Sequence, residues 1–337
     1  MKRIIVLALG LAAGAALVTG CAKRQTAQTS SGGERLTIAV IPKGTTHEFW
    51  KSIHAGALKA AQELDVEIVW KGPLREDNRD DQIRIVEDMT NRNVSGIVLA
   101  PLDDTSLRAP VSEAKQAGIP TVIIDSALKS DDIVSFVATD NYNGGKLAAE
   151  EMNRLLGGKG RIVVLRYAEG SASTMDREKG FLDTIAKFKG IQVLSSNQYG
   201  GATTETAYKA SENLLAPYKA PDGGLRLDGI YTPNESTTFG MLRALQDNKW
   251  AGKVKFVGFD SSEKLIQALE ARQLHGLVLQ SPMNMGYLGV KTLVAHIKGE
   301  AVEPRISTGE MLATPENMKL PEVAERLRPP YQKWLKE

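Results

Sequence analysis

The sequence has only one cysteine, Cys21, which excludes an internal disulfide and a metal site built on cysteine thiolates. Histidine is also scarce, and the four histidines lie far apart in the chain. His47-Glu48 begins like the HExxH zinc motif, but a lysine occupies the position of the second histidine. The sequence therefore predicts no metal and no cofactor.

Neither sign of charge dominates the chain. It has 42 basic and 40 acidic residues, for a formal net charge of +2, and the two signs alternate along it. Only 6% of the residues are aromatic, which is few for a surface that stacks single-stranded bases. Because nucleic-acid binding needs a concentrated basic surface, we expect no nucleic-acid partner.

Local catalytic motifs are absent as well. The sequence contains neither a GxSxG nucleophile elbow nor a GxxxxGK[ST] phosphate loop. The glycine-rich segment 157–160 does not precede a predicted helix, so we expect it to end one. The acidic pairs 103–104 and 131–132 are interpreted as solvated turns. We predict that the chain is not an enzyme, although carboxylates assembled from distant loops would leave no local pattern.

The only long apolar run lies at the N-terminus. Residues 1–3 are Met-Lys-Arg, residues 4–18 are apolar apart from glycines, and Thr19-Gly20 precedes Cys21. A basic start, an apolar run shorter than the roughly 20 residues of a membrane span, and small residues at a cleavage point are typical of an export signal. An uncleaved anchor helix is the alternative.

The end of this segment resembles the bacterial lipobox, in which the cysteine is lipidated and becomes the mature N-terminus. The resemblance implies a signal peptide over residues 1–20 and a lipid on Cys21 that holds the protein in the cell envelope, in the periplasm or at the outer face of the cytoplasmic membrane. Residues 21–35 are small and polar, which indicates a flexible tether.

From residue 36 onward, short apolar runs alternate with amphipathic stretches. Residues 36–41 are apolar and rich in β-branched side chains, as in a strand buried on both faces, and residues 48–64 place apolar side chains at helical spacing. Further strands are predicted over 66–70, 95–99, 121–124 and 134–138, and further helices over 77–91 and 105–117. Such repeats imply a parallel sheet with helices on both faces.

The same alternation starts again at residue 141. Helices are predicted over 141–156, 175–188, 203–215, 236–247, 262–272 and 286–298, and strands over 161–165, 192–198, 229–233, 255–259, 276–280 and 306–314. Residues 315–337 are polar and weakly helical, and we expect them to pack on the surface or to form a strap. The predicted fold class is α/β, with two doubly wound parallel-sheet lobes.

Polar and aromatic residues follow the first strand, at the sheet edge where ligands bind in open α/β folds. They are Lys43, His47, Phe49 and Trp50. Sugars need both an apolar face and hydrogen-bond partners, and aromatic and polar side chains supply these together. Because adjacent helical positions point about 100° apart, we expect only one of the two aromatic residues to face the cleft.

Polar residues also come directly after four later strands. The residues that follow them are Asp125 with Ser126, Asn234, Asp260 and Gln280. Each carboxylate or amide could bind ligand hydroxyls, and each could instead cap the following helix. The four positions together favour a ligand site.

These segments resemble the periplasmic ribose- and galactose-type sugar-binding proteins of the type I periplasmic binding protein superfamily. The segments are Phe49-Trp50, 137–141 (VATDN), 233–236 (PNES) with 240–245 (GMLRAL), 257–260 (VGFD) and Leu279-Gln280, and the similarity covers nearly all of residues 36–312. The resemblance implies hydroxyl contacts from Asp125, Asn234, Asp260 and Gln280, and stacking by Phe49 and Trp50.

The resemblance also implies how the chain works. A three-segment hinge would lie near Thr139 with Asp140, Asp260 and Gln280. It would join an N-terminal lobe of residues 36–138 plus 281–309 to a C-terminal lobe of residues 139–280 plus 310–337. The expected protein is a monomer that closes around a monosaccharide or polyol and delivers it to the permease of an ABC transporter.

The sequence departs from this family pattern at the cleft. Ser126 stands where an arginine usually follows the aspartate, and Met175 replaces a second cleft arginine, with Arg177 two residues later. Lys43 replaces a small polar residue. These changes put ribose itself in doubt as the ligand. Lys43 is interpreted either as a residue that contacts the ligand, including an anionic one, or as a solvated lysine at the rim.

Three other functions remain as alternatives. A transcription regulator of the same fold would need an N-terminal helix-turn-helix in place of the export signal. An enzyme acting on a sugar or nucleoside would need a nucleophile or base that is not recognisable here. A lipoprotein that senses a ligand for a chemoreceptor or kinase shares every feature above, and the sequence does not separate it from a transport component.

Overall fold

The computed structural model describes residues 35–335 of the 337-residue chain. The predicted signal peptide, the predicted lipidation site Cys21 and the predicted tether up to residue 34 lie outside the described residues. Within the described part, no helix combines the length and the apolar character needed to cross a membrane.

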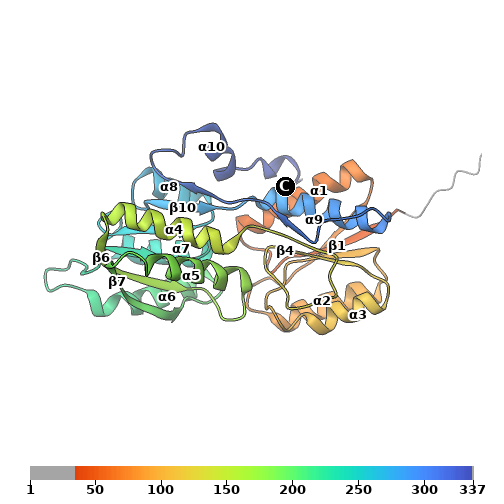
Figure 1. Cartoon of the computed structure of the whole chain (residues 1–337), viewed down its shortest axis with the longest axis horizontal. Coiled ribbons are helices and arrows are strands. Elements are labelled where there is room, and N and C mark those ends of the chain that lie inside the picture. The colour runs from red at the N-terminus through yellow and green to blue at the C-terminus, as the bar shows by residue number, and fades with distance from the viewer. Residues whose placement is uncertain (1–34, 336–337) are drawn as a thin grey trace, which may run out of the picture. The chain divides into compact units, whose positions relative to one another are not determined.

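The first lobe is built on a sheet of six parallel strands in the order β11-β5-β4-β3-β1-β2. The strands are β1 (Thr37–Ile41), β2 (Glu67–Trp70), β3 (Gly96–Leu99), β4 (Thr121–Ile124), β5 (Ser135–Ala138) and β11 (Arg305–Ser307). Helices α1 (Glu48–Leu64) and α9 (Pro282–Ile297) cover one face, and α2 (Arg79–Asn91) and α3 (Arg108–Gln116) cover the other. In Figure 1, α1 and α9 lie above the labelled strands β1 and β4, and α2 and α3 lie below them. Because both faces are covered, the inner strands are almost entirely apolar and buried.

The second lobe repeats this plan with the strand order β12-β10-β9-β8-β6-β7. The strands are β6 (Lys159–Arg166), β7 (Gly190–Tyr199), β8 (Gly229–Tyr231), β9 (Lys255–Phe259), β10 (Gly276–Leu279) and β12 (Met311–Ala313), of which β12 is antiparallel. Helices α4 (Asn141–Leu156) and α5 (Ala172–Ile185) cover one face, and α6 (Thr204–Leu215), α7 (Glu235–Asp247), α8 (Glu263–Glu270) and α10 (Pro321–Leu327) cover the other. The predicted fold class of two α/β lobes is confirmed.

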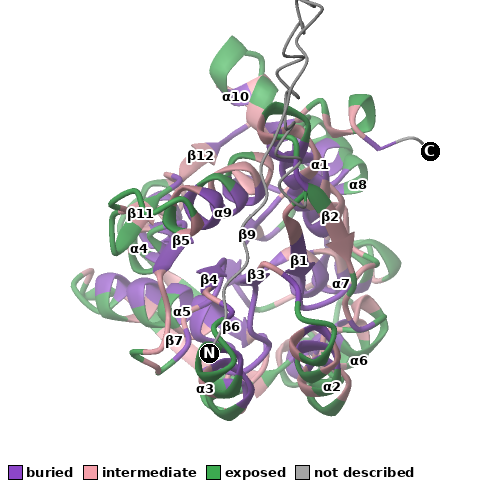
Figure 2. Ribbon diagram, turned by 90° about the vertical axis from the view of Figure 1, so that its right-hand side faces the viewer, coloured by how far each residue is buried: buried purple, intermediate pink, exposed green. Residues whose placement is uncertain are grey.

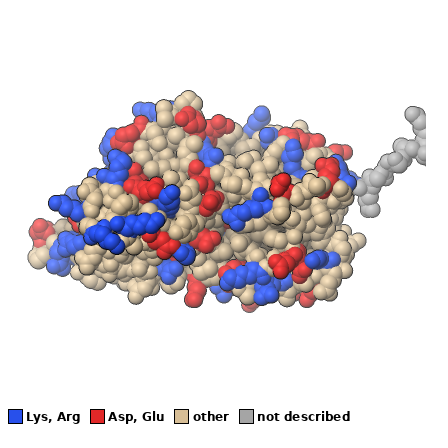
Figure 3. Space-filling model, in the orientation of Figure 1, with Lys and Arg blue, Asp and Glu red and all other residues tan. Residues whose placement is uncertain are grey.

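Burial follows this layered arrangement. In Figure 2 the inner strands and the inward faces of the helices are buried, whereas the edge strands β2, β7 and β11 and the outward faces of the helices are intermediate or exposed. Lysine, arginine, aspartate and glutamate are interspersed over the face shown in Figure 3, without a large region of one sign. The sequence pattern of apolar strands and amphipathic helices therefore corresponds to the core and surface of each lobe.

The chain passes between the two sheets at residues 139–140, 280–281 and 308–310. The prediction of a crossing at Asp260 is wrong, because the strands on either side of it, β9 and β10, belong to the same sheet. The prediction of one strand over 306–314 is also wrong. Gly309 adopts a φ of 72°, which ends β11 and lets the chain enter the other sheet as β12.

Several helix bounds differ from the predicted ones. Helix α5 begins at Ala172, earlier than predicted, and α9 begins at Pro282, since proline is well suited to the first position of a helix. Helix α4 ends at Leu156 with Gly157 in the left-handed region, as predicted. The rest of that glycine-rich segment differs, because Lys159 already belongs to β6.

Close packing of α4 on α5 fixes one part of the site. A Cβ atom added to Gly145 in α4 would lie 2.0 Å from the carbonyl oxygen of Arg177 in α5. A Cβ atom added to Gly180 in α5 would lie 2.0 Å from the carbonyl oxygen of Tyr142 in α4. Only glycine allows these helices to approach so closely, and the contact holds the backbone of Arg177 in place.

The C-terminal segment after β12 runs from the second lobe to the first. Val323 and Leu327 of α10 are buried in the core of the second lobe, and the following 3-10 helix η2 (Tyr331–Lys333) packs against α1. We call residues 328–335 the strap. The predicted weak helicity of this tail corresponds to α10 and η2, and the segment runs along the surface from one lobe to the other.

Candidate functional site

A small cavity of about 30 Å³ lies where the carboxyl ends of the strands of both lobes meet. Its lining comes from both lobes and from the crossing at residue 280, and we call it the interlobe site. The lining residues are Lys43, His47, Phe49, Trp50, Glu76, Asp125, Tyr167, Ser171, Ser173, Thr174, Arg177, Asn234, Glu235, Asp260 and Gln280. This volume is about that occupied by one molecule in liquid water.

Most of the predicted site residues therefore lie together, with two exceptions. Met175 is half-buried and does not line the cavity. Ser126 is buried behind the lining, where its hydroxyl accepts a hydrogen bond of 3.1 Å from the backbone N–H of Ser173. The expectation that only one aromatic residue faces the cleft is wrong, because the first turn of α1 begins at the cavity and both Phe49 and Trp50 border it.

Lys43 joins the two lobes. Its side chain is almost completely buried, and its Nζ lies 3.1 Å from the carboxylate of Asp125 in the first lobe. The same ammonium group donates hydrogen bonds to the hydroxyls of Ser171 (3.2 Å) and Ser173 (3.1 Å) in the second lobe. The interpretation of Lys43 as a solvated rim lysine is wrong for this arrangement of the lobes.

Glu76 organises a second group of side chains. Its carboxylate lies 2.7 Å from Nδ1 of His47 and accepts hydrogen bonds from the indole of Trp50 (2.6 Å) and from the hydroxyl of Tyr167 (2.8 Å), which belongs to the other lobe. Burial lowers the pKa of His47, but the charge and hydrogen bond of Glu76 outweigh it and raise that pKa to about 9. Burial likewise opposes ionisation of Glu76, but His47 lowers its pKa to about 2. The two groups form an ion pair at neutral pH.

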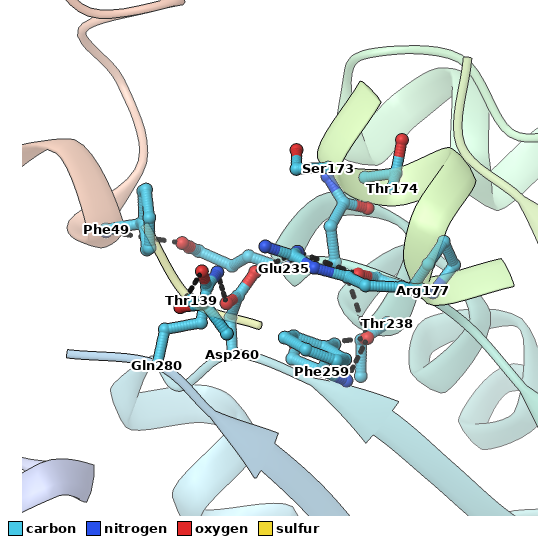
Figure 4. A network of polar contacts seen from close by, with 12 residues as sticks. Phe49, Thr139, Ser173, Thr174, Arg177, Glu235, Thr238, Phe259, Asp260 and Gln280 are labelled. Carbon is cyan, nitrogen blue, oxygen red and sulfur yellow. Dashed lines mark hydrogen bonds and ion pairs between the residues drawn. The ribbon is translucent and has the colours of Figure 1, made fainter. Parts of the chain in front are cut away.

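Asp260 lies at the centre of a polar chain that reaches the crossing between the lobes (Figure 4). Its carboxylate accepts a hydrogen bond of 2.7 Å from the amide of Gln280, whose carbonyl in turn accepts one of 2.9 Å from the hydroxyl of Thr139. It also accepts the backbone N–H of Glu235 at 2.9 Å. Burial raises the pKa of Asp260, and Arg177 acts against that rise.

The predicted strand-end residues differ in whether they cap helices. Asn234 is the N-cap of α7, and its side chain accepts the backbone N–H of Thr237. Asp140 likewise caps α4. Asp260 does not cap α8, because Ser262 occupies that position. Asp260 has a φ of 69° and Asp125 a φ of 62°, so both carboxylates are held in the left-handed region and turned toward the site.

Arg177 is buried beneath the site with one nitrogen unused (Figure 4). Its Nε donates to Asn141 (2.8 Å), its Nη1 donates to the carbonyl of Pro233 (3.0 Å), and its guanidinium lies 4.1 Å over the ring of Phe259. Its Nη2 is buried and has no hydrogen-bond partner among the described residues. A buried donor without a partner costs about 1–3 kcal/mol, so this atom favours a ligand oxygen beside it.

Sequence reasoning missed four lining residues that matter for the chemistry, namely Glu76, Tyr167, Ser173 and Glu235. Glu235 directly follows the predicted Asn234 and could have been found by the same strand-end pattern. Tyr167 directly follows Arg166, the last residue of β6, so the strand-end pattern could have found it as well. Glu76 lies in the loop between β2 and α2, several residues beyond the strand, and carries no local signal.

Ionisation of the buried carboxylate of Glu235 lowers the folding stability as the pH rises. Among the described residues, its carboxylate accepts one hydrogen bond, from the backbone N–H of Phe49 at 3.5 Å. Burial raises its pKa from 4.5 to about 7, although the charge of His47 acts in the opposite direction. Because the folded state keeps a proton that the unfolded state releases, folding stability falls as the pH rises from 4.5 through 7.

We therefore expect Glu235→Gln to stabilise the protein at pH 8 by about 1–3 kcal/mol and to have little effect at pH 5. Urea unfolding followed by circular dichroism at both pH values measures this difference. The same substitution at Glu150, which is exposed on α4, should leave the wild-type pH dependence unchanged. Parallel pH profiles for Glu235→Gln and the wild type would show that Glu235 carries no buried charge.

Comparisons with known proteins agree with this geometry. Residues 38–301 match the periplasmic binding protein domain family. The ribose import binding protein RbsB of Escherichia coli is 29% identical over 80% of this chain and 87% of its own length. A solute-binding protein of an ABC transporter from Agrobacterium vitis, solved with bound D-fucose, is 35% identical with a TM-score of 0.82 over 86% of this chain and 99% of its own.

A carbohydrate transporter solute-binding protein from Agrobacterium radiobacter, solved in complex with D-arabinose, is 32% identical. Its TM-score is 0.82, and the match covers 88% of this chain and 99% of that one. The family match spans most of both lobes and every residue that lines the interlobe site. The chain therefore belongs to the periplasmic binding protein family.

Proposed function

We propose that the chain is an exported solute-binding protein that captures a monosaccharide or polyol in the interlobe site and delivers it to an ABC transporter. Its family consists of transport components that bind solutes and are not enzymes. The observation that carries the proposal is Arg177, whose buried Nη2 has no partner among the described residues and which lines the cavity together with carboxylates, amides and hydroxyls. Such a mixture of donors and acceptors suits vicinal hydroxyls.

The charges around the site favour a neutral ligand. Lys43 lies beside Asp125, and His47 lies beside Glu76. Arg177 lies 4.0 Å from Asp260, so each of these cations has a carboxylate within ion-pair distance. An anionic ligand would need a cation without such a neighbour, because an uncompensated buried charge is costly. A neutral sugar can exchange hydrogen bonds with the paired groups without changing the net charge.

Several hydrogen bonds favour capture by closure of the two lobes. Lys43 reaches Ser171 and Ser173, and Glu76 reaches Tyr167, all across the lobe boundary. The cavity between them is too small for a monosaccharide, so a sugar has to enter while these contacts are open. The ligand would then shift the population toward a closed form in which both lobes contact it.

The ligand class is tested by titrating the protein with a panel of pentoses, hexoses, inositols, sugar phosphates and nucleosides. We expect one or more neutral sugars to quench or enhance tryptophan fluorescence through Trp50, and to raise the melting temperature. Stabilisation should reach about 2.7 kcal/mol at 100-fold above Kd. Binding of phosphorylated or acidic compounds alone would contradict the neutral-sugar proposal, and an unchanged radius of gyration on binding would contradict closure.

We further propose that the protein is a monomer attached to the membrane through a lipid on Cys21. The support is the sequence alone, namely the basic and apolar start and the lone cysteine after Thr19-Gly20. We expect radiolabelled palmitate to be incorporated into the wild type expressed in a bacterial host, and Cys21→Ser to lose the label and leave the membrane fraction. An unlabelled wild type would contradict the lipid anchor, and a dimer by light scattering would contradict the monomer.

A further inference from the structure

A second, larger cavity adjoins the interlobe site under the strap. It has a volume of about 380 Å³, within the range of about 300–1,000 Å³ that small-molecule sites occupy. We call it the strap chamber. It shares three lining residues with the interlobe site, Phe49, Asp260 and Gln280, so these side chains border both spaces.

The walls of the strap chamber come from both lobes and from the C-terminus. Glu48 and Ser52 of α1 line one side, and Pro330, Tyr331 and Gln332 of the strap line another. Tyr331 and the strap prolines offer flat apolar surface, and the glutamate, serine and glutamine side chains offer hydrogen-bond partners. This is the same combination of surfaces that favours a sugar in the interlobe site.

The strap is fixed at both of its ends, so the chamber is part of the folded structure. At the start of the strap, Arg328 forms a two-bond ion pair with Glu263 of α8, at 3.1 and 3.2 Å. At its other end, η2 packs against α1, and Leu335 is buried. The matched family domain ends at residue 301, so the strap and its wall of the chamber lie beyond the conserved domain model.

From this geometry we infer that the strap chamber is a second subsite, which takes a hydroxylated extension of the ligand. The inference rests on the proposed function, since the first ring of the ligand would lie in the interlobe site. The extension would be the second sugar of a disaccharide or the uncharged aglycone of a glycoside, and it would pass Phe49 to reach the chamber. Ligands longer than a monosaccharide would then bind more tightly than the single ring.

The experiment compares each monosaccharide that binds with its methyl glycosides and with disaccharides that contain it, including maltose, trehalose, lactose and melibiose, by calorimetry on the full chain. We expect at least one extended ligand to bind tenfold or more tightly than its parent monosaccharide. The double substitution Tyr331→Ala with Gln332→Ala should remove this advantage and leave the Kd for the monosaccharide within about twofold.

Two further variants make the result specific. Glu48→Gln changes the part of the wall that α1 contributes without altering the strap, and should also reduce the advantage of the extended ligand. Lys333→Ala is the matched control, because Lys333 belongs to the same turn but lines a neighbouring cavity and not the strap chamber. It should leave both affinities unchanged.

The outcomes separate the two proposals. If monosaccharides bind at least as tightly as every extended ligand, the second subsite is wrong and the proposed function stands. If the double variant weakens both classes of ligand equally, the strap supports the lobes and does not contact an extension, and the inference is also overturned. If no sugar of either kind binds the wild type, the proposed function fails and the inference fails with it.

Discussion

Asp260→Asn should weaken sugar binding by roughly 10- to 150-fold while the protein remains folded. The carboxylate lines the interlobe site and is held by Gln280 and by the backbone of Glu235. Hydrogen bonds to a charged group contribute about 1.5–3 kcal/mol, and each 1.4 kcal/mol is a factor of ten in Kd. Asparagine tolerates the positive φ at this position, so the backbone should not change.

Asp65→Asn provides a matched control for this experiment. Asp65 also has a positive φ, of 51°, but its side chain is 91% exposed at the end of α1. Calorimetric titration of both variants with a sugar that binds the wild type should show a loss of affinity only for Asp260→Asn. An unchanged Kd for that variant would remove Asp260 from the ligand site.

Arg177→Met should cause the largest loss of stability, about 3 kcal/mol or more, together with a loss of sugar binding. The substitution leaves the carboxylate of Asp260 buried without its cation and leaves Asn141 and the carbonyl of Pro233 without their donor. Removing one partner of a buried pair typically costs about 3–5 kcal/mol. Guanidinium unfolding measures the stability, and titration at a temperature where the variant is folded measures binding.

The corresponding control is Arg243→Met, which makes the same change on the exposed surface of α7. We expect that variant to unfold within about 0.5 kcal/mol of the wild type and to bind sugar normally. If Arg177→Met unfolds at the wild-type denaturant concentration, its guanidinium does not compensate Asp260. If it loses stability but keeps full affinity, Nη2 does not contact the ligand.

Much of the fold could be predicted from the sequence because both sheets are covered on both faces. Strands such as β3 and β4 are short and wholly apolar, and the amphipathic helices between them repeat regularly. The prediction failed where tertiary contacts determine which sheet a strand joins. Residues 306–314 were predicted as one strand, but Gly309 interrupts it and lets β11 pair with β5 and β12 pair with β10.

The candidate site was predictable where residues directly follow strands, as Asp125, Asn234, Asp260 and Gln280 do. Tyr167 directly follows β6 and fits the same pattern, whereas Glu76 was not predictable, because a loop brings it to the cavity several residues after β2. The role of Lys43 was also open in the sequence. Its position next to a strand end is compatible with a solvated rim. Two serine hydroxyls surround its ammonium group only because the start of α5, in the second lobe, lies against it.

The crossings between the lobes also constrain the order in which the polypeptide can fold. The core on one face of the first sheet contains Ile38, Ile53 and Ala57 from the start of the chain, and Val290 and Leu293 of α9 from near its end. These contacts have a high sequence separation, which slows folding. The first lobe thus cannot complete its core until α9 has been synthesised, after the strands of the other lobe up to β10. A nascent chain therefore remains incompletely folded for most of its synthesis, a state that suits passage through a membrane before folding.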